Sequence, residues 1–273
     1  MPYRHAPYYV LVCIAVIVAG FWPSYFAKGA DVPWQFHAHG IAASIWVLMV
    51  LVQSGTVHKQ QLPLHRAVGK SSLILFPFLI GGLAAIIDLT GKGFVAGNSP
   101  SRVDYGGQFL VGLALAIAAY VVLYYRALKY RRKVWLHSGY MLATPLILFE
   151  SPFSRLMGGF VPGLTIRGPE DFDRIIPSIE WAMTLEVLIV AVLWWRFREK
   201  ASPFLVAAAF IIAQMLTMGL MHDNATLERL LAMIGNLPSA AVVMTGFALG
   251  AATAWLGWER GKRPTIPVQA QTA

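Results

Sequence analysis

Eight apolar stretches of 17 to 22 residues alternate with short polar segments along almost the whole chain. About 20 apolar residues in a helix cross the hydrocarbon of a bilayer, and within hydrocarbon a helix satisfies its own backbone. The pattern predicts an all-α, polytopic transmembrane helical bundle with about eight spanning helices, forming a single domain over residues 1–273. The predicted spans are 8–26, 36–57, 67–87, 106–125, 137–153, 177–195, 203–221 and 237–258, and residues 264–273 are predicted to form a flexible tail.

Lysine and arginine residues give the predicted bundle a direction. With eight spans, 15 of the 22 basic residues fall on one side, together with only Glu199 and Glu259 as acids. The opposite side carries seven basic and ten acidic residues. The excess of basic residues therefore appears on every second connection along the chain, as eight successive spans require. Because cytoplasmic loops are enriched in Lys and Arg, we expect both termini in the cytoplasm and the protein in the cytoplasmic (inner) membrane.

Composition agrees with a membrane protein. The 273-residue chain is 57% hydrophobic and only 13% charged, with mean hydropathy +0.60, whereas soluble domains carry about 25% charged residues. A net charge of +9 would indicate nucleic acid in a soluble protein, but topology explains these basic residues, so we expect a lipid bilayer and no nucleic acid as partner. The single cysteine, Cys13, excludes an intrachain disulfide and a multi-cysteine metal site.

Ionisable and polar residues inside the apolar stretches are the functional candidates, because a charged side chain in the bilayer costs a few kcal/mol or more. His39, Trp46 and Gln53 recur every seven residues and share one helix face. In the ordinary interpretation of that face, Trp46 is core and Gln53 makes an interhelical hydrogen bond. Further polar candidates are Asp88, Arg155 and, nearest the middle of its span, Glu186.

The histidines fall into two layers, which permits haem ligation. Neutral imidazole binds haem iron, and a membrane haem b needs two histidines that face each other from different helices. His39 and His222 form a predicted external pair, and His65 and His137 a cytoplasmic pair. Two such layers, about 20 Å apart, would carry electrons across the membrane. In the ordinary interpretation, His65 and His137 are polar helix-end residues at the lipid interface.

Two other chemistries remain open at the external side. Mixed imidazole and carboxylate side chains are ligands for a divalent metal ion, and the candidates are His37, His39, Glu150, Glu180, His222 and Asp223. Alternatively, Arg155 with the acidic residues and histidines there binds a proton or polar ligand in a non-redox transporter or sensor.

Three short motifs lie within residues 37–155, namely the HAHG string, the LHRAVG turn and the HSGYM start of a later helix. Together they resemble an uncharacterised family of bacterial multi-helix membrane proteins. Ser138 and Gly139 depart from that pattern, which has basic residues there. The layered histidines are also distantly similar to transmembrane b-type cytochromes. The resemblance carries over His39, Gly40, Trp46, Gln53, His65, Arg66, Gly69, His137, Met141 and Arg155.

The leading hypothesis from the sequence is therefore a membrane protein that binds haem or another metal between its helices. Its activity would be electron transfer or oxidation of a lipophilic small molecule such as a quinone. Whether the chain is an enzyme stays open, as does the presence of partner membrane subunits.

Overall fold

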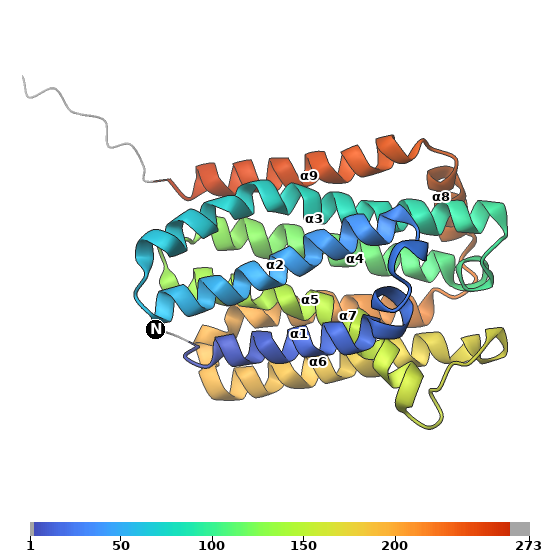
Figure 1. The fold of residues 1–273 in the computed structure, drawn as a ribbon, viewed down its shortest axis with the longest axis horizontal. Coiled ribbons are helices and arrows are strands. Elements are labelled where there is room, and N and C mark those ends of the chain that lie inside the picture. The colour runs from blue at the N-terminus through green and yellow to red at the C-terminus, as the bar shows by residue number, and fades with distance from the viewer. Residues whose placement is uncertain (1–2, 263–273) are drawn as a thin grey trace, which may run out of the picture.

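The computed structural model describes residues 3–262, and every element in that range is a helix. The predicted tail at 264–273 lies outside the described residues. Most of the helices run up and down along one common axis (Figure 1). They are α1 (Ala6–Phe21), α2 (Trp34–His58), α3 (Leu62–Ala96), α4 (Pro100–Lys129), α5 (Val134–Phe160), α6 (Ile175–Phe197), α7 (Ser202–Leu220), α8 (Ala225–Gly235) and α9 (Ser239–Arg260), with short turns η1 (Trp22–Phe26), η2 (Gly29–Asp31), η3 (Pro169–Arg174) and η4 (Arg198–Ala201).

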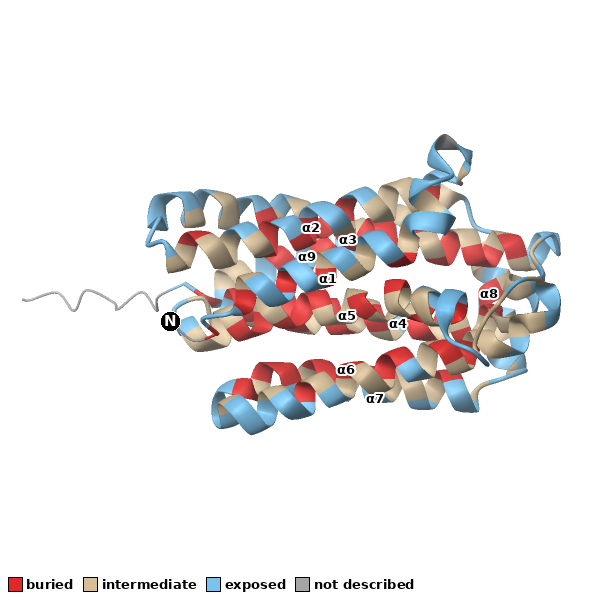
Figure 2. Ribbon diagram, turned by 60° about the horizontal axis from the view of Figure 1, so that its bottom comes forward, coloured by how far each residue is buried: buried red, intermediate tan, exposed pale blue. Residues whose placement is uncertain are grey.

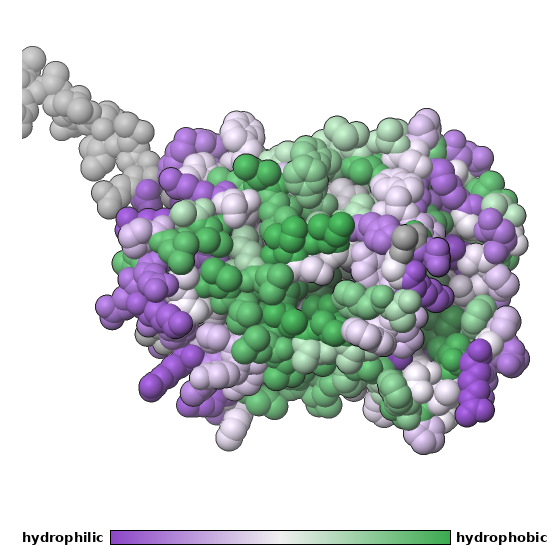
Figure 3. All heavy atoms as spheres, in the orientation of Figure 1, coloured by the Kyte–Doolittle hydropathy of each residue, from purple (hydrophilic) through white to green (hydrophobic). Residues whose placement is uncertain are grey.

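Six helical stretches of the described chain are long and apolar enough to cross a membrane. They correspond to α1 with η1, α2, α3, α4, a continuous stretch from η3 through α7, and α9. An apolar band crosses the middle of the visible face, and polar residues gather toward its two ends (Figure 3). The all-helical, multi-pass membrane architecture predicted from the sequence is thereby confirmed.

Each predicted span lies on a different helix, but several helices extend well beyond it. Residues 91–105, expected to connect two spans, are mostly helical, because α3 continues to Ala96 and α4 starts at Pro100. The break between them has local causes. Gly97 adopts a left-handed conformation (φ 63°), which ends α3, and Pro100 occupies the first turn of α4, where its missing N–H is harmless.

The amphipathic helix α8 is absent from the eight predicted segments. Asn224 caps it, because its side chain accepts hydrogen bonds from the backbone N–H groups of Thr226 and Leu227. Its Leu231 is fully buried and packs beside Gly106 of α4. At 11 residues α8 is too short to span a bilayer, and it covers one end of α3 and α4.

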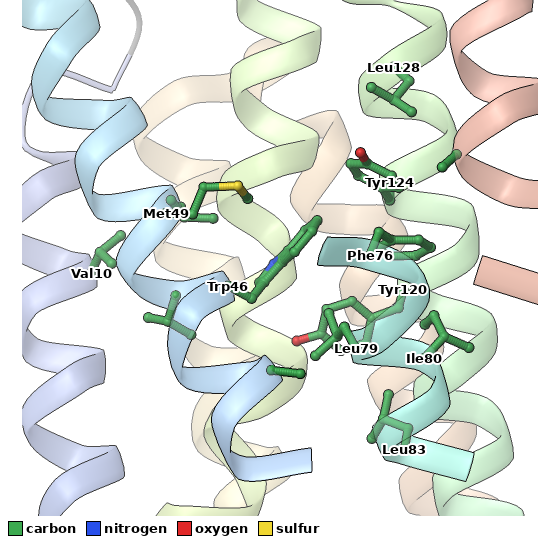
Figure 4. Close-up of a cluster of buried hydrophobic side chains, with 14 residues drawn as sticks. Val10, Trp46, Met49, Phe76, Leu79, Ile80, Leu83, Tyr120, Tyr124 and Leu128 are labelled. Carbon is green, nitrogen blue, oxygen red and sulfur yellow. The ribbon is translucent and has the colours of Figure 1, made fainter. Parts of the chain in front are cut away.

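An aromatic cluster holds the centre of the bundle together (Figure 4). Phe76 and Tyr124 stack with ring centroids 4.1 Å apart, and Trp46 meets Tyr124 edge-on at 5.2 Å. All three side chains are fully buried, and Tyr120 lies beside them. Buried residues concentrate between the helices, and exposed residues lie on the outer surface (Figure 2). The core interpretation of Trp46 therefore holds.

Small residues let α9 approach α3 closely, as is common between membrane helices. A methyl group added at Gly250 would lie 2.7 Å from Cα of Pro77, and one at Gly246 would lie 2.9 Å from the carbonyl oxygen of Ile80. Both distances are too short for a real contact. These two glycines, one helical turn apart, therefore fix the separation of the two backbones.

Candidate binding cavity at the basic end

A cavity of about 640 Å³ lies at the end of the bundle that carries most of the lysines and arginines. This volume is in the range of sites for small molecules and cofactors, about 300–1,000 Å³. Met49, Val50, Leu128, Met141 and Leu142 give it an apolar wall. The polar wall comes from α2, α3, the α4–α5 connection and the start of α5, and comprises Gln53, Ser54, His58, His65, Arg66, Lys70, Arg131, Arg132, His137 and Ser138.

Three histidines on this wall hold their rings in the same way. Nδ1 of His137 lies 2.9 Å from the carbonyl oxygen of Ala127, Nδ1 of His58 lies 2.6 Å from that of Ser54, and Nδ1 of His65 lies 3.3 Å from that of Gln53. A carbonyl oxygen only accepts, so each Nδ1 donates its proton. In the neutral ring the other nitrogen, Nε2, then carries a free lone pair, which is the arrangement of a metal-ligating histidine.

Gln53 connects two of the elements that form the cavity. Its side-chain Nε2 donates a hydrogen bond to the backbone carbonyl of His65, 2.9 Å away. The backbone carbonyl of Gln53 in turn accepts a hydrogen bond from Nδ1 of the His65 ring. Gly69 faces the same amide, because a methyl group there would lie 3.3 Å from Nε2 of Gln53. The interhelical hydrogen bond expected of Gln53 is therefore present, and it fixes the start of α3, including His65, against α2.

Several buried polar atoms of the cavity residues have no partner. Gln53 Oε1, Ser54 Oγ and His58 Nε2 are all buried without a hydrogen bond. Most buried polar atoms in proteins are satisfied, and each exception needs an explanation. All three atoms belong to residues that line the cavity, so this wall is held by fewer internal hydrogen bonds than its polar side chains could make.

The rim of the cavity is cationic. Arg66, Lys70, Arg131 and Arg132 all line it. Desolvation, and then repulsion from Arg132, lower the pKa of Arg131, with Glu259 acting in the opposite direction. Arg131 donates a hydrogen bond to the carbonyl of Trp258 at 2.7 Å and lies over the Trp258 ring, 4.2 Å from its centroid. This group of positive charges is suited to an anionic ligand.

The two members of the predicted external pair, His39 and His222, lie in different surroundings. His39 packs against α3, where a methyl group at Gly82 would lie 2.8 Å from the His39 Cα. His222 is exposed in the turn after α7, where its Nδ1 lies 2.9 Å from Asp223 and its ring meets Tyr105. Within the described residues no hydrogen bond or ring contact joins the two imidazoles, since His39 packs against α3 and His222 is exposed in the turn after α7.

The six predicted ligands for a divalent metal ion are also not gathered. Within residues 3–262 no three His, Cys, Asp or Glu side chains form a group that could hold a metal ion. His37 is hydrogen-bonded to the Tyr25 hydroxyl at 2.9 Å, and Glu180 lies against Gly219 of α7. Glu150 lies on α5 and interacts with Arg155 of the same helix. His39, His222 and Asp223 lie at the places described above, so this predicted cluster has no common centre.

The remaining polar candidates have separate local roles. The indole N–H of Trp46 donates to the Thr144 hydroxyl at 2.9 Å. Asp88 is fully buried, accepts from Gln35 at 3.3 Å and pairs with Lys92 one turn along α3. Arg155 is exposed, donates to Ser151 and lies over the Phe21 ring. Glu186 is buried in α6.

The cavity contains six of the ten residues that the family resemblance carries over, namely Gln53, His65, Arg66, Gly69, His137 and Met141. The sequence did not predict four of the lining residues as site residues, namely His58, Lys70, Arg131 and Arg132. The lysine and the arginines were interpreted only as signals of membrane orientation. Their position next to His65 and His137 in the chain was the available signal. No protein-family model, no curated protein and no solved structure matches the chain.

Proposed function

We propose that this protein binds haem b in the basic-end cavity, with His65 and His137 as the two axial ligands, and exchanges electrons with a lipophilic molecule such as a quinone. One observation carries the proposal. Two histidines from different helices, α3 and α5, line one cavity and each holds its ring by an Nδ1 hydrogen bond to a backbone carbonyl. Nε2 of each ring is then available to iron.

The proposal places eight spans in the cytoplasmic (inner) membrane, with both termini and the cavity on the cytoplasmic side. Its support is the concentration of basic residues at the cavity end, where α1 begins, α9 ends and the α2–α3, α4–α5 and α6–α7 connections lie (Figure 1). Helix α5 is less apolar than the six candidate spans, because it contains His137, Glu150 and Arg155. As an inner helix of the bundle, it need not match the lipid on every face.

The cavity residues fit a haem in three respects. Met49, Val50, Leu128 and Leu142 offer apolar contact for the macrocycle, and the cationic rim offers partners for its two propionates. The cavity volume of about 640 Å³ suits a cofactor of this size. When bound, the haem supplies one-electron chemistry.

The protein's own residues would orient the ligands and set the local field. Ala127 and Gln53 hold the two rings through their carbonyl groups, which fixes the tautomer of each. The two propionates would be neutralised by the cationic rim of Arg66, Lys70, Arg131 and Arg132. Their negative charges would in turn reduce the repulsion among these four cations. The apolar wall would keep water from the iron side of each imidazole.

Visible spectroscopy of the full-length protein, purified after expression with haem supply, tests this proposal. We expect the spectrum of a six-coordinate, low-spin haem, with about one haem per chain. H65A and H137A should each abolish the low-spin form, while the exposed His5 gives the control H5A, which should leave it unchanged. A preparation without haem absorption, or spectra that H65A and H137A leave intact, would overturn the proposal.

A second candidate is a non-redox transporter or sensor that binds an anionic molecule in the same cavity. The cationic rim favours it, because it suits an anion without iron. Haem-free protein whose melting temperature rises with an anionic amphiphile, and whose rise is lost in R131Q, would favour this candidate.

A further inference from the structure

We infer that Glu186 is a proton-binding residue inside the membrane and that it exchanges its proton with the end of the bundle opposite the cavity, by way of Glu150. This inference does not depend on haem binding, because the residues concerned lie outside the cavity.

Glu186 is buried without a counter-charge. Its exposure is 1%, and Oε1 is buried and has no hydrogen-bond partner. The titratable groups that face it are Glu150 from α5, Cys13 from α1 and Tyr120 from α4, and none of them is a cation. Helix α7, which also packs on α6, contains no titratable residue. A carboxylate there would be an unpaired buried charge, which costs several kcal/mol, so the group is held in its protonated form.

Glu150 is in a different situation, although it is the nearest acid to Glu186. Arg155, slightly more than one turn further along the same helix, favours a negative charge on Glu150. Helices α5 and α6, which carry Glu150 and Glu186, pack against each other, and a negative charge on Glu150 disfavours a second one on Glu186. Two neighbouring carboxyl groups with one cation favour a single negative charge, since two like charges at short range repel. One proton therefore belongs to the pair.

The three groups lie at increasing depth. Arg155 is exposed near the end of α5, Glu150 is half-buried slightly more than one turn earlier in the same helix, and Glu186 is fully buried on α6. In this scheme a proton that reaches Glu150 from the aqueous end passes to Glu186 across the contact between α5 and α6. A glutamine at 186 would fill the same space, whereas only a carboxyl group can hold and release the proton.

Infrared difference spectroscopy of the full-length protein in lipid, between acidic and alkaline buffer, tests this inference. At neutral pH we expect a C=O band of a protonated carboxyl group that shifts in D₂O. E186Q should remove the band, and E180Q, at a half-buried position of the same helix, should keep it. E150Q removes the neighbouring negative charge, so it should lower the pH at which Glu186 loses its proton.

Three results would overturn the inference. They are no protonated carboxyl band at neutral pH, a band that E186Q leaves unchanged, and a band that does not shift in D₂O over hours, since the last would mean that no path leads to the solvent. If E186Q does not fold, E150Q decides the matter through the shift of the titration midpoint.

Discussion

Replacing Thr144 by valine should destabilise the bundle although the two side chains have nearly the same shape. Thr144 is fully buried, and its hydroxyl accepts from Trp46 Nε1 at 2.9 Å. The same hydroxyl donates to the carbonyl of Met141 at 2.8 Å. Pro145 has no N–H to offer that carbonyl, so Thr144 replaces the missing helical partner. Valine would leave one buried donor and one buried acceptor unpaired.

The magnitude follows from these two orphaned groups. An unpaired buried donor or acceptor costs about 1–3 kcal/mol in soluble proteins, while hydrogen bonds between membrane helices average about 0.6 kcal/mol. Trp46 has no exposed surface through which it could recruit water. We therefore expect a loss of about 2 kcal/mol, which corresponds to about a 30-fold shift in the unfolding equilibrium.

Thiol labelling measures this loss without an added probe. Cys13 is the only cysteine, is buried in α1, and its Sγ lies 3.9 Å from the carbonyl oxygen of Pro145, next to the substituted residue. A maleimide reaches it only when α1 separates from α5, so under conditions of fast reclosure the labelling rate reports the open population. In T144V we expect labelling about 30-fold faster than in the wild type.

Thr245 provides the matched control. Its hydroxyl donates to the Ala241 carbonyl within the same helix, and the side chain is exposed on α9. T245V should therefore label at close to the wild-type rate. If T144V labelled within about twofold of T245V, the two buried hydrogen bonds would not contribute as argued, since about 1.4 kcal/mol gives a tenfold change.

Two further substitutions test the packing and the chain start. G250A should lower the melting temperature, with a loss of about 1–3 kcal/mol, because the new methyl group would lie 2.7 Å from the Pro77 backbone, whereas G55A meets nothing within 4 Å and should be neutral or stabilising. Burial raises the pKa of Tyr3 to about 12 from its ordinary 10, so the native state disfavours the phenolate, and the wild type should lose stability as pH rises through that interval. Y3F should remove this loss of stability between pH 10 and 12. At neutral pH it should be about 1 kcal/mol less stable than the wild type, because the hydrogen bond to the Lys200 carbonyl is gone.

Much of the fold could be predicted from apolar segment length, because lipid imposes that length on spanning helices. Segment length does not predict helices that continue beyond the apolar residues or that are too short to span. Helix α3 continues from the predicted end at residue 87 to Ala96 because Asp88, Thr90 and Lys92 satisfy one another or the helix backbone, and no hydropathy rule detects this. Helix α8 buries Leu231 without being apolar all round, so its Asn224 cap and its amphipathic pattern mark it in the sequence, whereas hydropathy does not.

The candidate site was predicted in part. His65 and His137 lie near the basic ends of their helices, and helix polarity alone places those ends in one layer. Whether two side chains in a layer face each other depends on helix order around the bundle, which hydropathy does not specify. His39 and His222 illustrate this, because they share a layer in the sequence but pack against α3 and beside Tyr105, respectively. The unpartnered atoms of Gln53, Ser54 and His58 could be recognised only from the packed structure.

The length of α3 determines how the cavity is reached. Its 35 residues rise about 52 Å, against a hydrocarbon thickness of about 30 Å. To stay within the hydrocarbon the helix would have to tilt by about 55°, well outside the usual range of 0–40°. One or both ends must therefore emerge among the headgroups or in water. With Leu62 as its first residue, α3 carries His65, Arg66 and Lys70 at the basic end, and charged side chains favour the level of the phosphates for that end and for the cavity beside it. A charged ligand can thus arrive from the aqueous side and leave its apolar part in the bundle.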